Sequence, residues 1–166
     1  NRYNWGGLFG YYQKEELSYE PEDGPTAIKN NNKIMIGTTG VEIRKYIYNV
    51  GGVVGKIGAE TTLVDNLENT KDAYIVPEGL DTAPTSWGLV EDKVYNLNTV
   101  MGSNSNIANT IRTINVGGVI GYAGAGSSEL TITNIKNDSE MILGYQNVGG
   151  LVGYLDENTV VTNEEL

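Results

Sequence analysis

Carboxylates are the side chains of this sequence that could most directly do chemistry. The segment Glu15 to Pro25 carries five acidic residues, and Glu91-Asp92 and Asp156-Glu157-Asn158 form shorter acidic groups. Such hard oxygen ligands could bind calcium or a basic partner. None of these groups has the alternating-ligand spacing of a calcium loop, so we interpret them as solvated loops and polar turns. Calcium stays open as a ligand of these carboxylates.

Paired carboxylates could also cleave glycosidic bonds, because that reaction needs an acid and a base or nucleophile on either side of the bond. The candidates are Asp65, Asp81, Glu91 and Asp92. No second set of functional groups can be recognised beside them, so no catalytic residue is assigned. The sequence has no His and no Cys. This excludes histidine bases, HExxH metallopeptidase sites and thiolate chemistry, and we predict a protein that is not an enzyme and has no cofactor.

The overall composition narrows the remaining classes. The chain has 166 residues, 39% of them hydrophobic, and a net charge of −10. This length and apolar content predict one folded domain, residues 1–166. The negative charge argues against nucleic-acid partners, and no apolar run is long enough to span a membrane. Because the chain opens with Asn1-Arg2-Tyr3, we interpret it as a mature piece or a fragment of a longer protein.

Aromatic residues are the second group that could bind a ligand. Exposed tyrosines could stack on sugar rings or anchor a protein partner, but we favour the interpretation that they cover a sheet. Tyr11, Tyr122 and Tyr154 each follow a recurring glycine, so we predict that they form a stacked column. Trp5 and Trp87 are interpreted as plugs, that is, as side chains that fill space in the core or at a corner of the fold. Asn137-Asp138-Ser139 matches a glycosylation acceptor, a short motif that is common by chance.

A repeated motif must position these groups. The six-residue glycine motif reads WGGLFG at 5–10, VGGVVG at 50–55, VGGVIG at 116–121 and VGGLVG at 148–153, and an Asn precedes every copy. A fifth copy that has lost part of the motif, called the worn copy below, is predicted around Trp87. The glycines that we assign to the structural repeat are Gly6, Gly7, Gly10, Gly51, Gly52, Gly55, Gly117, Gly118, Gly121, Gly149, Gly150 and Gly153.

A second motif, aliphatic-x-Asn, recurs between the glycine motifs. Three of its copies precede a glycine position by an equal offset of 22 residues, which supports the worn copy at Trp87. We therefore predict that its asparagines occupy equivalent positions. These residues are Asn30, Asn66, Asn96, Asn134 and Asn163.

Short strands separated by these motifs predict the fold class. Segments such as 130–135 alternate at period two, and no long segment has helical periodicity. The expected fold is an all-β solenoid, similar to a parallel β-helix, with about five turns and very little helix. Stacked glycines would allow close approach between turns, and stacked asparagines would form hydrogen-bonded ladders. Residues 11–40 are expected to form a less regular part with an insertion; the alternative architecture is a β-sandwich or barrel.

The copies NVGGVVG, NVGGVIG and NVGGLVG, with the upstream TITN and YNL segments, resemble the GLUG repeat. The resemblance covers most of Gly51 to Asn163 and is weaker at 11–40 and around Trp87. The GLUG repeat occurs in large bacterial surface and secreted proteins, including filamentous-haemagglutinin-like adhesins, and outside the catalytic domain of IgA-cleaving metallopeptidases. The resemblance implies an extracellular stalk or passenger segment and supplies no catalytic residues.

These observations predict a non-enzymatic scaffold of a bacterial adhesin or surface fibre, located outside the cell or on its surface. It would act as a rigid spacer whose loops display binding groups. Its partners would be flanking domains of a larger polypeptide and a host glycan or matrix protein. Two alternatives stay open: an accessory domain of a secreted enzyme such as a metallopeptidase, and a subunit that associates end to end into fibres.

Overall fold

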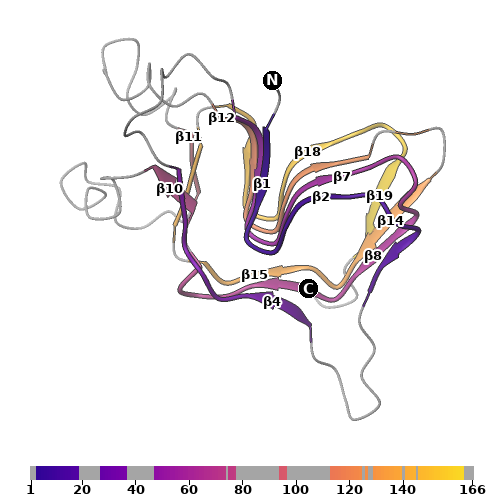
Figure 1. Ribbon diagram of the computed structural model, residues 1–166, viewed down its shortest axis with the longest axis horizontal. Coiled ribbons are helices and arrows are strands. Elements are labelled where there is room, and N and C mark those ends of the chain that lie inside the picture. The colour runs from indigo at the N-terminus through magenta and orange to yellow at the C-terminus, as the bar shows by residue number, and fades with distance from the viewer. Residues whose placement is uncertain are drawn as a thin grey trace.

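The chain forms a solenoid-like stack of short parallel strands in a computed structural model (Figure 1). The structure describes residues 3–18, 27–36, 47–73, 75–77, 94–96, 113–124, 126, 129–139, 141–144 and 146–162. Within these ranges there is no helix, and every strand pairing is parallel. The prediction of an all-β chain of stacked parallel strands is thus confirmed, and an antiparallel sandwich does not fit these pairings.

The strands form five sheets that run along the stack, which we call sheets A to E. Sheet A contains β1 (Tyr3–Gly6), β6 (Ile47–Gly51), β12 (Thr113–Gly117) and β17 (Val148–Gly149). Sheet B contains β2 (Phe9–Tyr12), β7 (Val54–Ile57), β13 (Ile120–Ala123) and β18 (Val152–Leu155). Sheet C contains β3 (Glu16–Leu17), β8 (Leu63–Asp65), β14 (Leu130–Thr133) and β19 (Thr159–Thr162).

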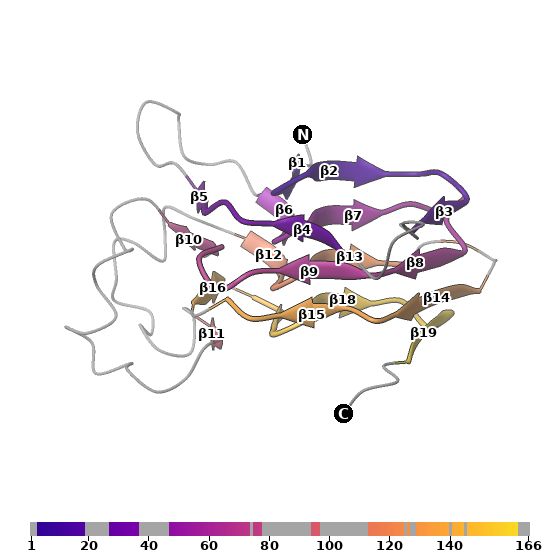
Figure 2. The same ribbon diagram turned by 90° about the horizontal axis from the view of Figure 1, so that it is seen from below.

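The remaining two sheets contain strands of the first three turns together with β11. Sheet D contains β4 (Ile28–Asn30), β9 (Leu67–Asn69) and β15 (Lys136–Asn137). Sheet E contains β5 (Ile34–Ile36), β10 (Ile75–Pro77), β16 (Ile142–Gly144) and β11 (Val94–Asn96), in that order. The chain visits sheets A, B, C, D and E in succession and then begins the next level, so equivalent strands lie one above another (Figure 2).

The described strands form four levels rather than the predicted five turns. The worn motif at Trp87 lies outside the described residues, and the strands on either side of it in sequence leave no gap for another level. β6 pairs directly with β12, and β10 pairs directly with β16. The one described strand of the intervening segment, β11, pairs with the far side of β16 and so occupies the fourth level of sheet E.

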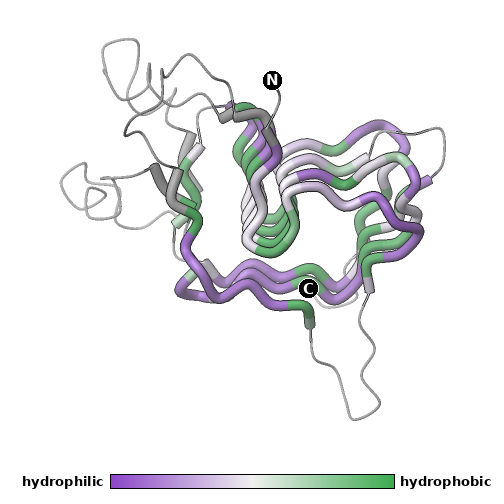
Figure 3. Tube along the Cα trace, in the orientation of Figure 1, coloured by the Kyte–Doolittle hydropathy of each residue, from purple (hydrophilic) through white to green (hydrophobic). Residues whose placement is uncertain are grey.

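Each glycine motif makes a sharp bend that divides the core in two. Its first strand packs Val50 and Val116 into one cluster with Ile75, and its second strand packs Val54 and Ile120 into another. All five side chains are fully buried. The apolar residues on both faces of the motif are explained by this bend, because its two halves face different cores. Figure 3 shows the hydrophobic residues along the bends and the hydrophilic residues along β4, β9 and β15.

Alternation at period two fixes which side chains enter these cores. In β14 the residues Leu130 and Ile132 are buried, whereas the intervening threonines are half-buried. Because successive side chains of a strand point to opposite faces, this pattern places one apolar column inside sheet C. The strands predicted in this segment therefore form as the sequence indicates.

Candidate functional site: stacked ladders and an aromatic column

The first glycine of each motif forms an in-register column. Gly6 pairs with Gly51, Gly51 with Gly117, and Gly117 with Gly149. A Cβ atom on any of them would lie 1.9 to 2.0 Å from the carbonyl oxygen three residues later in its own bend. The bend therefore requires glycine at this position, since no side chain can fit inside it.

The second glycine faces the next level and a buried asparagine. A Cβ atom on Gly52 would lie 2.0 Å from the carbonyl oxygen of Gly118 and 2.4 Å from Cγ of Asn69. Gly118 has the same relation to the carbonyl oxygen of Gly150, at 2.1 Å, and to Asn137. The tips of the first three bends thus touch the opposite wall of the coil, and this contact separates the two cores.

The third glycine lets sheets A and B approach each other. A Cβ atom on Gly55 would lie 2.6 Å from the backbone nitrogen of Trp5, and one on Gly121 would lie 2.6 Å from that of Val50. Gly153 has the equivalent contact with the nitrogen of Val116, at 2.5 Å. Gly10 lies 2.8 Å from the carbonyl oxygen of Asn4 by the same measure.

The asparagines that precede the glycine motifs form one continuous ladder. Asn49 donates from Nδ2 to Oδ1 of Asn4 at 2.6 Å, and Asn115 donates to Asn49 at 2.8 Å. Asn147 donates to Asn115 at 2.9 Å. Asn49 and Asn115 are buried, so these amide bonds satisfy groups that water does not reach.

A second ladder runs along sheet D with the opposite donor direction. Asn30 donates to Asn69, and Asn69 donates to Asn137, each at 3.0 Å. The remaining amide hydrogens of Asn30 and Asn69 reach the backbone carbonyls of Asn32 and Ala73. This ladder is the wall that the glycine bends touch.

The prediction of one column for the aliphatic-x-Asn motif is wrong. Asn30 pairs with Asn69, not with Asn66, because the second and third turns carry the motif twice, three residues apart. Asn66 and Asn134 belong to the corner before the ladder, where φ is 57° and 50°. Asn96 ends β11 opposite Gly144 of sheet E, and Asn163 lies outside the described residues.

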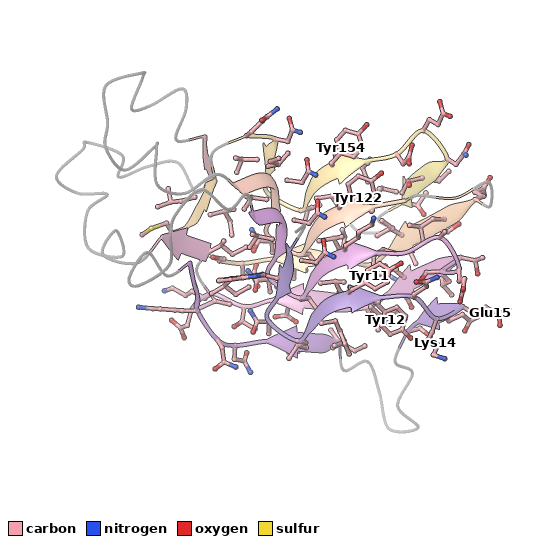
Figure 4. The ribbon with its side chains drawn as sticks, turned by 45° about the horizontal axis from the view of Figure 1, so that its top comes forward. Tyr11, Tyr12, Lys14, Glu15, Tyr122 and Tyr154 are labelled. Atoms are coloured by element: carbon pink, nitrogen blue, oxygen red, sulfur yellow. The ribbon has the colours of Figure 1, made fainter. Side chains whose placement is uncertain are left out.

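The predicted tyrosine column exists on the outer face of sheet B. The register aligns Tyr11 with Lys56, Lys56 with Tyr122, and Tyr122 with Tyr154. The rings of Tyr122 and Tyr154 stack with centroids 5.1 Å apart and planes 12° from parallel. Lys56 places Nζ 5.1 Å from the Tyr122 centroid and 5.9 Å from that of Tyr11. Figure 4 labels Tyr11 on β2, Tyr122 on β13 and Tyr154 on β18, along one flank of the stack.

Two tyrosines of this column also form hydrogen bonds through their hydroxyl groups. The Tyr122 hydroxyl donates to Oδ2 of Asp156 at 3.2 Å, and the Tyr11 hydroxyl donates to Gln13 at 2.5 Å. Burial raises the pKa of Tyr122 above its ordinary value of 10.0, and the negative charge of Asp156 raises it further. The column is therefore a connected structure in which ring faces meet one another and the lysine.

This stacking limits what the column can bind. A sugar ring stacks on the face of an aromatic ring. Both faces of Tyr122 are already covered, by Lys56 and by Tyr154, so in the middle of the flank this ring presents its edge and hydroxyl group, whereas Tyr11 and Tyr154 are 49% and 43% exposed. The geometry favours cohesion between levels over a glycan platform along the flank.

Charged side chains also form a column, on sheet D. Lys29 contacts Glu68 with Nζ and Oε2 2.8 Å apart, and Glu68 pairs in register with Lys136. Lys136 contacts Asp138 at 2.7 Å, and this hydrogen bond raises the pKa of Lys136. Opposite charges on neighbouring levels thus alternate along the outer wall.

Two of the acidic residues that were candidates for catalysis or calcium, Asp65 and Asp156, have carboxylates engaged in local contacts, whereas Glu15, Glu16 and Glu157 are exposed. Asp65 accepts hydrogen bonds from Asn66 and Asn134 on its two oxygens, at 3.0 and 2.9 Å. Asp156 accepts from Tyr122 and from the backbone N–H of Glu157. Residues 19–25, Asp81, Glu91 and Asp92 lie outside the described residues. Within the described ranges no cluster of three metal-binding side chains occurs.

Two further sequence motifs acquire structural roles. Asn137 of the glycosylation motif is part of the sheet D ladder, and its Nδ2 would be 2.5 Å from a Cβ atom on Gly118. A glycan on this nitrogen would not fit the folded chain. Trp5 is half-buried and packs against the cluster of Val50 and Ile75, in agreement with a plug at the core, whereas Trp87 lies outside the described residues.

Comparison with protein-family models, curated proteins and solved structures found no significant match. The resemblance to the GLUG repeat therefore stays a prediction from the motif. Among the described residues no helix is long and apolar enough to cross a membrane.

Proposed function

We propose that this chain is a non-enzymatic repeat scaffold, part of an extracellular bacterial adhesin or surface fibre, that acts as a rigid spacer and displays binding segments. The fold class in this proposal is a β-solenoid of the GLUG type. The proposal assigns cohesion to the repeated residues and recognition to the segments between them.

The observation that carries the proposal is that the repeated polar side chains contact one another rather than a common site. Two asparagine ladders, the tyrosine-lysine column and the Lys29–Glu68–Lys136 column all run parallel to the stack. An active site needs polar groups that converge on a reacting atom. Here they are arranged to hold successive levels together, which supports a mechanical role.

Variation in chain length is largest at one corner of the coil, although the connection from sheet C to sheet D also varies, from residues 18–27 in the first turn to Asn66 alone in the second. Residues 37–46 and 78–112 both connect a strand of sheet E to the next strand of sheet A. The equivalent third connection, between β16 and β17, spans only residues 145–147. Binding residues are often carried by segments of variable length on a rigid scaffold. These two segments are therefore the best candidates for recognition.

A glycan and matrix-protein array tests the proposal. The wild-type chain is compared with a variant in which residues 79–92 are replaced by a short Gly-Ser linker that leaves β11 intact. Binding that is lost in this variant supports display by the segment. The matched control is Tyr154→Ala, which alters the exposed flank and keeps both segments. Binding that is lost in the control and kept in the replacement variant would contradict the assignment of recognition to this corner.

A further inference from the structure

We propose that Tyr122 and Tyr154 form a site of oxidative modification, at which a carbon–carbon bond joins the two rings as a dityrosine cross-link. The bond would connect β13 on the third level covalently to β18 on the fourth. The co-reactant is a peroxidase-type one-electron oxidant acting with hydrogen peroxide. This inference does not depend on the proposed scaffold role. It rests on the geometry of the two rings and of the groups around them.

The two tyrosines start from neighbouring positions of a parallel ladder. Tyr122 pairs in register with Tyr154, so their Cα atoms lie about 4.8 Å apart. Their ring centroids are 5.1 Å apart, and the ring planes are 12° from parallel. Figure 4 shows both residues on one flank of the stack. Radicals formed on these two rings would therefore meet without diffusion and without a change in the path of the backbone.

The reactive edge of the Tyr122 ring faces outward. Its neighbours Ile120 and Ala123 on β13 are buried, whereas Tyr122 is half-buried on the outer face of sheet B. Lys56 and Tyr154 cover the two faces of the ring, so the part that reaches solvent is its edge. Phenoxyl radicals couple at Cε, the carbon next to the one that bears the hydroxyl group. The stack thus shields the ring faces and leaves the coupling edge accessible.

A carboxylate is placed to take the phenol proton of Tyr122. The Tyr122 hydroxyl donates to Oδ2 of Asp156 at 3.2 Å. Loss of an electron makes a phenol strongly acidic, so oxidation is easier when a proton acceptor is already hydrogen-bonded to it. The other oxygen of Asp156 accepts from the backbone N–H of Glu157, which fixes the orientation of the carboxylate. Asp156 is therefore the proton acceptor of this site.

The reaction balances with one molecule of hydrogen peroxide. Each tyrosine loses one electron to the oxidant and one proton from its hydroxyl group. A Cε–Cε bond then forms between the rings, and each of these carbons releases its hydrogen as a proton while the phenol oxygen regains one. The two electrons and two protons removed in all convert one hydrogen peroxide molecule into two water molecules.

Lys56 separates this pair from the remaining tyrosine of the column. It lies in register between Tyr11 and Tyr122, with its Nζ 5.1 Å from the centroid of the Tyr122 ring. A lysine side chain forms no phenoxyl radical and cannot couple to either ring. Tyr11, which is 49% exposed on the same flank, is therefore an internal control that should stay unlinked to Tyr122.

Oxidation followed by peptide mass spectrometry tests the assignment. The folded chain is treated with a haem peroxidase and hydrogen peroxide and is then digested with trypsin. Tyr122 lies in the tryptic peptide 113–136, and Tyr154 lies in the peptide 137–166. The expected product has the summed mass of these peptides less two hydrogen atoms, and it comes from the monomer band of a denaturing gel. The second peptide also contains Tyr145, so fragmentation must place the bond at Tyr154. A bond at Tyr145, or a product found only in dimers, would overturn the proposal.

Conservative variants separate this site from general oxidation. Tyr122→Phe and Tyr154→Phe keep an aromatic ring in the stack and should each abolish the cross-link, because phenylalanine has no hydroxyl group to oxidise. Tyr11→Phe is the matched control and should leave the yield unchanged. An unchanged yield in Tyr154→Phe, or an equal fall in all three variants, would contradict the assigned pair.

Lys56→Tyr tests whether stacking in register decides which rings couple. This variant places a tyrosine between Tyr11 and Tyr122, so a second cross-link should appear, from position 56 to Tyr122. Circular dichroism and the melting temperature establish that the variant is folded. A folded variant that forms only the original cross-link would contradict the geometric basis of the site.

Asp156→Asn tests the proton acceptor. It should slow formation of the cross-link by about tenfold, at the low end for a general base because water also reaches this flank. Added acetate, an external base, should restore part of the rate in this variant and have little effect on wild type. A rate equal to that of wild type, or a slow rate that acetate does not raise, would overturn the role of Asp156.

Discussion

Replacement of Gly52 by alanine tests the physical basis of the coil. The added methyl group would lie 2.0 Å from the carbonyl oxygen of Gly118 and 2.4 Å from Cγ and Oδ1 of Asn69. Neither neighbour can easily move, because one is the backbone of the next level and the other is a fully buried ladder residue. We expect this overpacking to cost about 3 kcal/mol or more.

Part of this cost is offset in the unfolded chain. Alanine has less backbone freedom than glycine, which favours folding by about 0.4–1 kcal/mol. The net loss should therefore be about 2–3 kcal/mol, which corresponds to a fall in Tm of about 5–10 °C for a domain of this size. Far-UV circular dichroism during heating, with urea unfolding followed by the same signal, measures both quantities.

Gly150→Ala is the matched control for this measurement. Gly150 occupies the equivalent position on the last level, where no further carbonyl group and no ladder asparagine follow among the described residues. Its free energy of unfolding should therefore change by less than about 0.5 kcal/mol. An equal loss in both variants, or an unchanged Tm for Gly52→Ala, would refute the explanation by contact between levels.

Four further predictions concern individual contacts. Asn69→Leu should lower the free energy of unfolding by about 2–3 kcal/mol in urea titrations, because it leaves Asn30 and Asn137 without their buried ladder partner. Thr61→Val should raise it by about 1 kcal/mol in the same assay, because the buried Oγ1 of Thr61 has no hydrogen-bond partner among the described residues. A loss of stability would contradict this. Asn66→Gly should be tolerated and Asn66→Ala should cost about 1–2 kcal/mol in thermal unfolding, since φ is 57° there. The pKa of Tyr122 is raised in the folded state, so its contribution to stability is present below pH 10.0 and is lost as the pH rises through the folded pKa. Urea midpoints measured as the pH rises above 10.0 should therefore fall less steeply for Tyr122→Phe than for wild type. Identical pH profiles would contradict this role.

Much of the fold could be predicted because stacking repeats the same local environment. The glycine motif recurs at each level with nearly the same sequence, and this repetition indicates where the bends lie and that they are in register. The same reasoning placed Tyr11, Tyr122 and Tyr154 in one column, as the structure does. Periodic strands with β-branched residues, such as β14, were also recognisable from alternation alone.

The errors came from features that depend on partners distant in sequence. Asn66 and Asn69 have the same local motif, and only their pairing across levels distinguishes a corner residue from a ladder residue. Lys56 was not predicted as a member of the aromatic column, because a lysine stands where the other levels have tyrosine. Its position six residues after Val50, which matches Tyr11, Tyr122 and Tyr154 in their motifs, is the signal that would have found it.

The place of β11 has a consequence for how the chain folds. A simple coil could form one turn after another as it leaves the ribosome, because each strand needs only the preceding level. β11 is synthesised before the third turn but pairs with β16 of that turn, so it must wait until β16 has been made. Once formed, β16 is held between two earlier segments, β10 and β11. Stepwise unfolding from the C-terminal end would therefore stop at β16 until its pairing with β11 is broken.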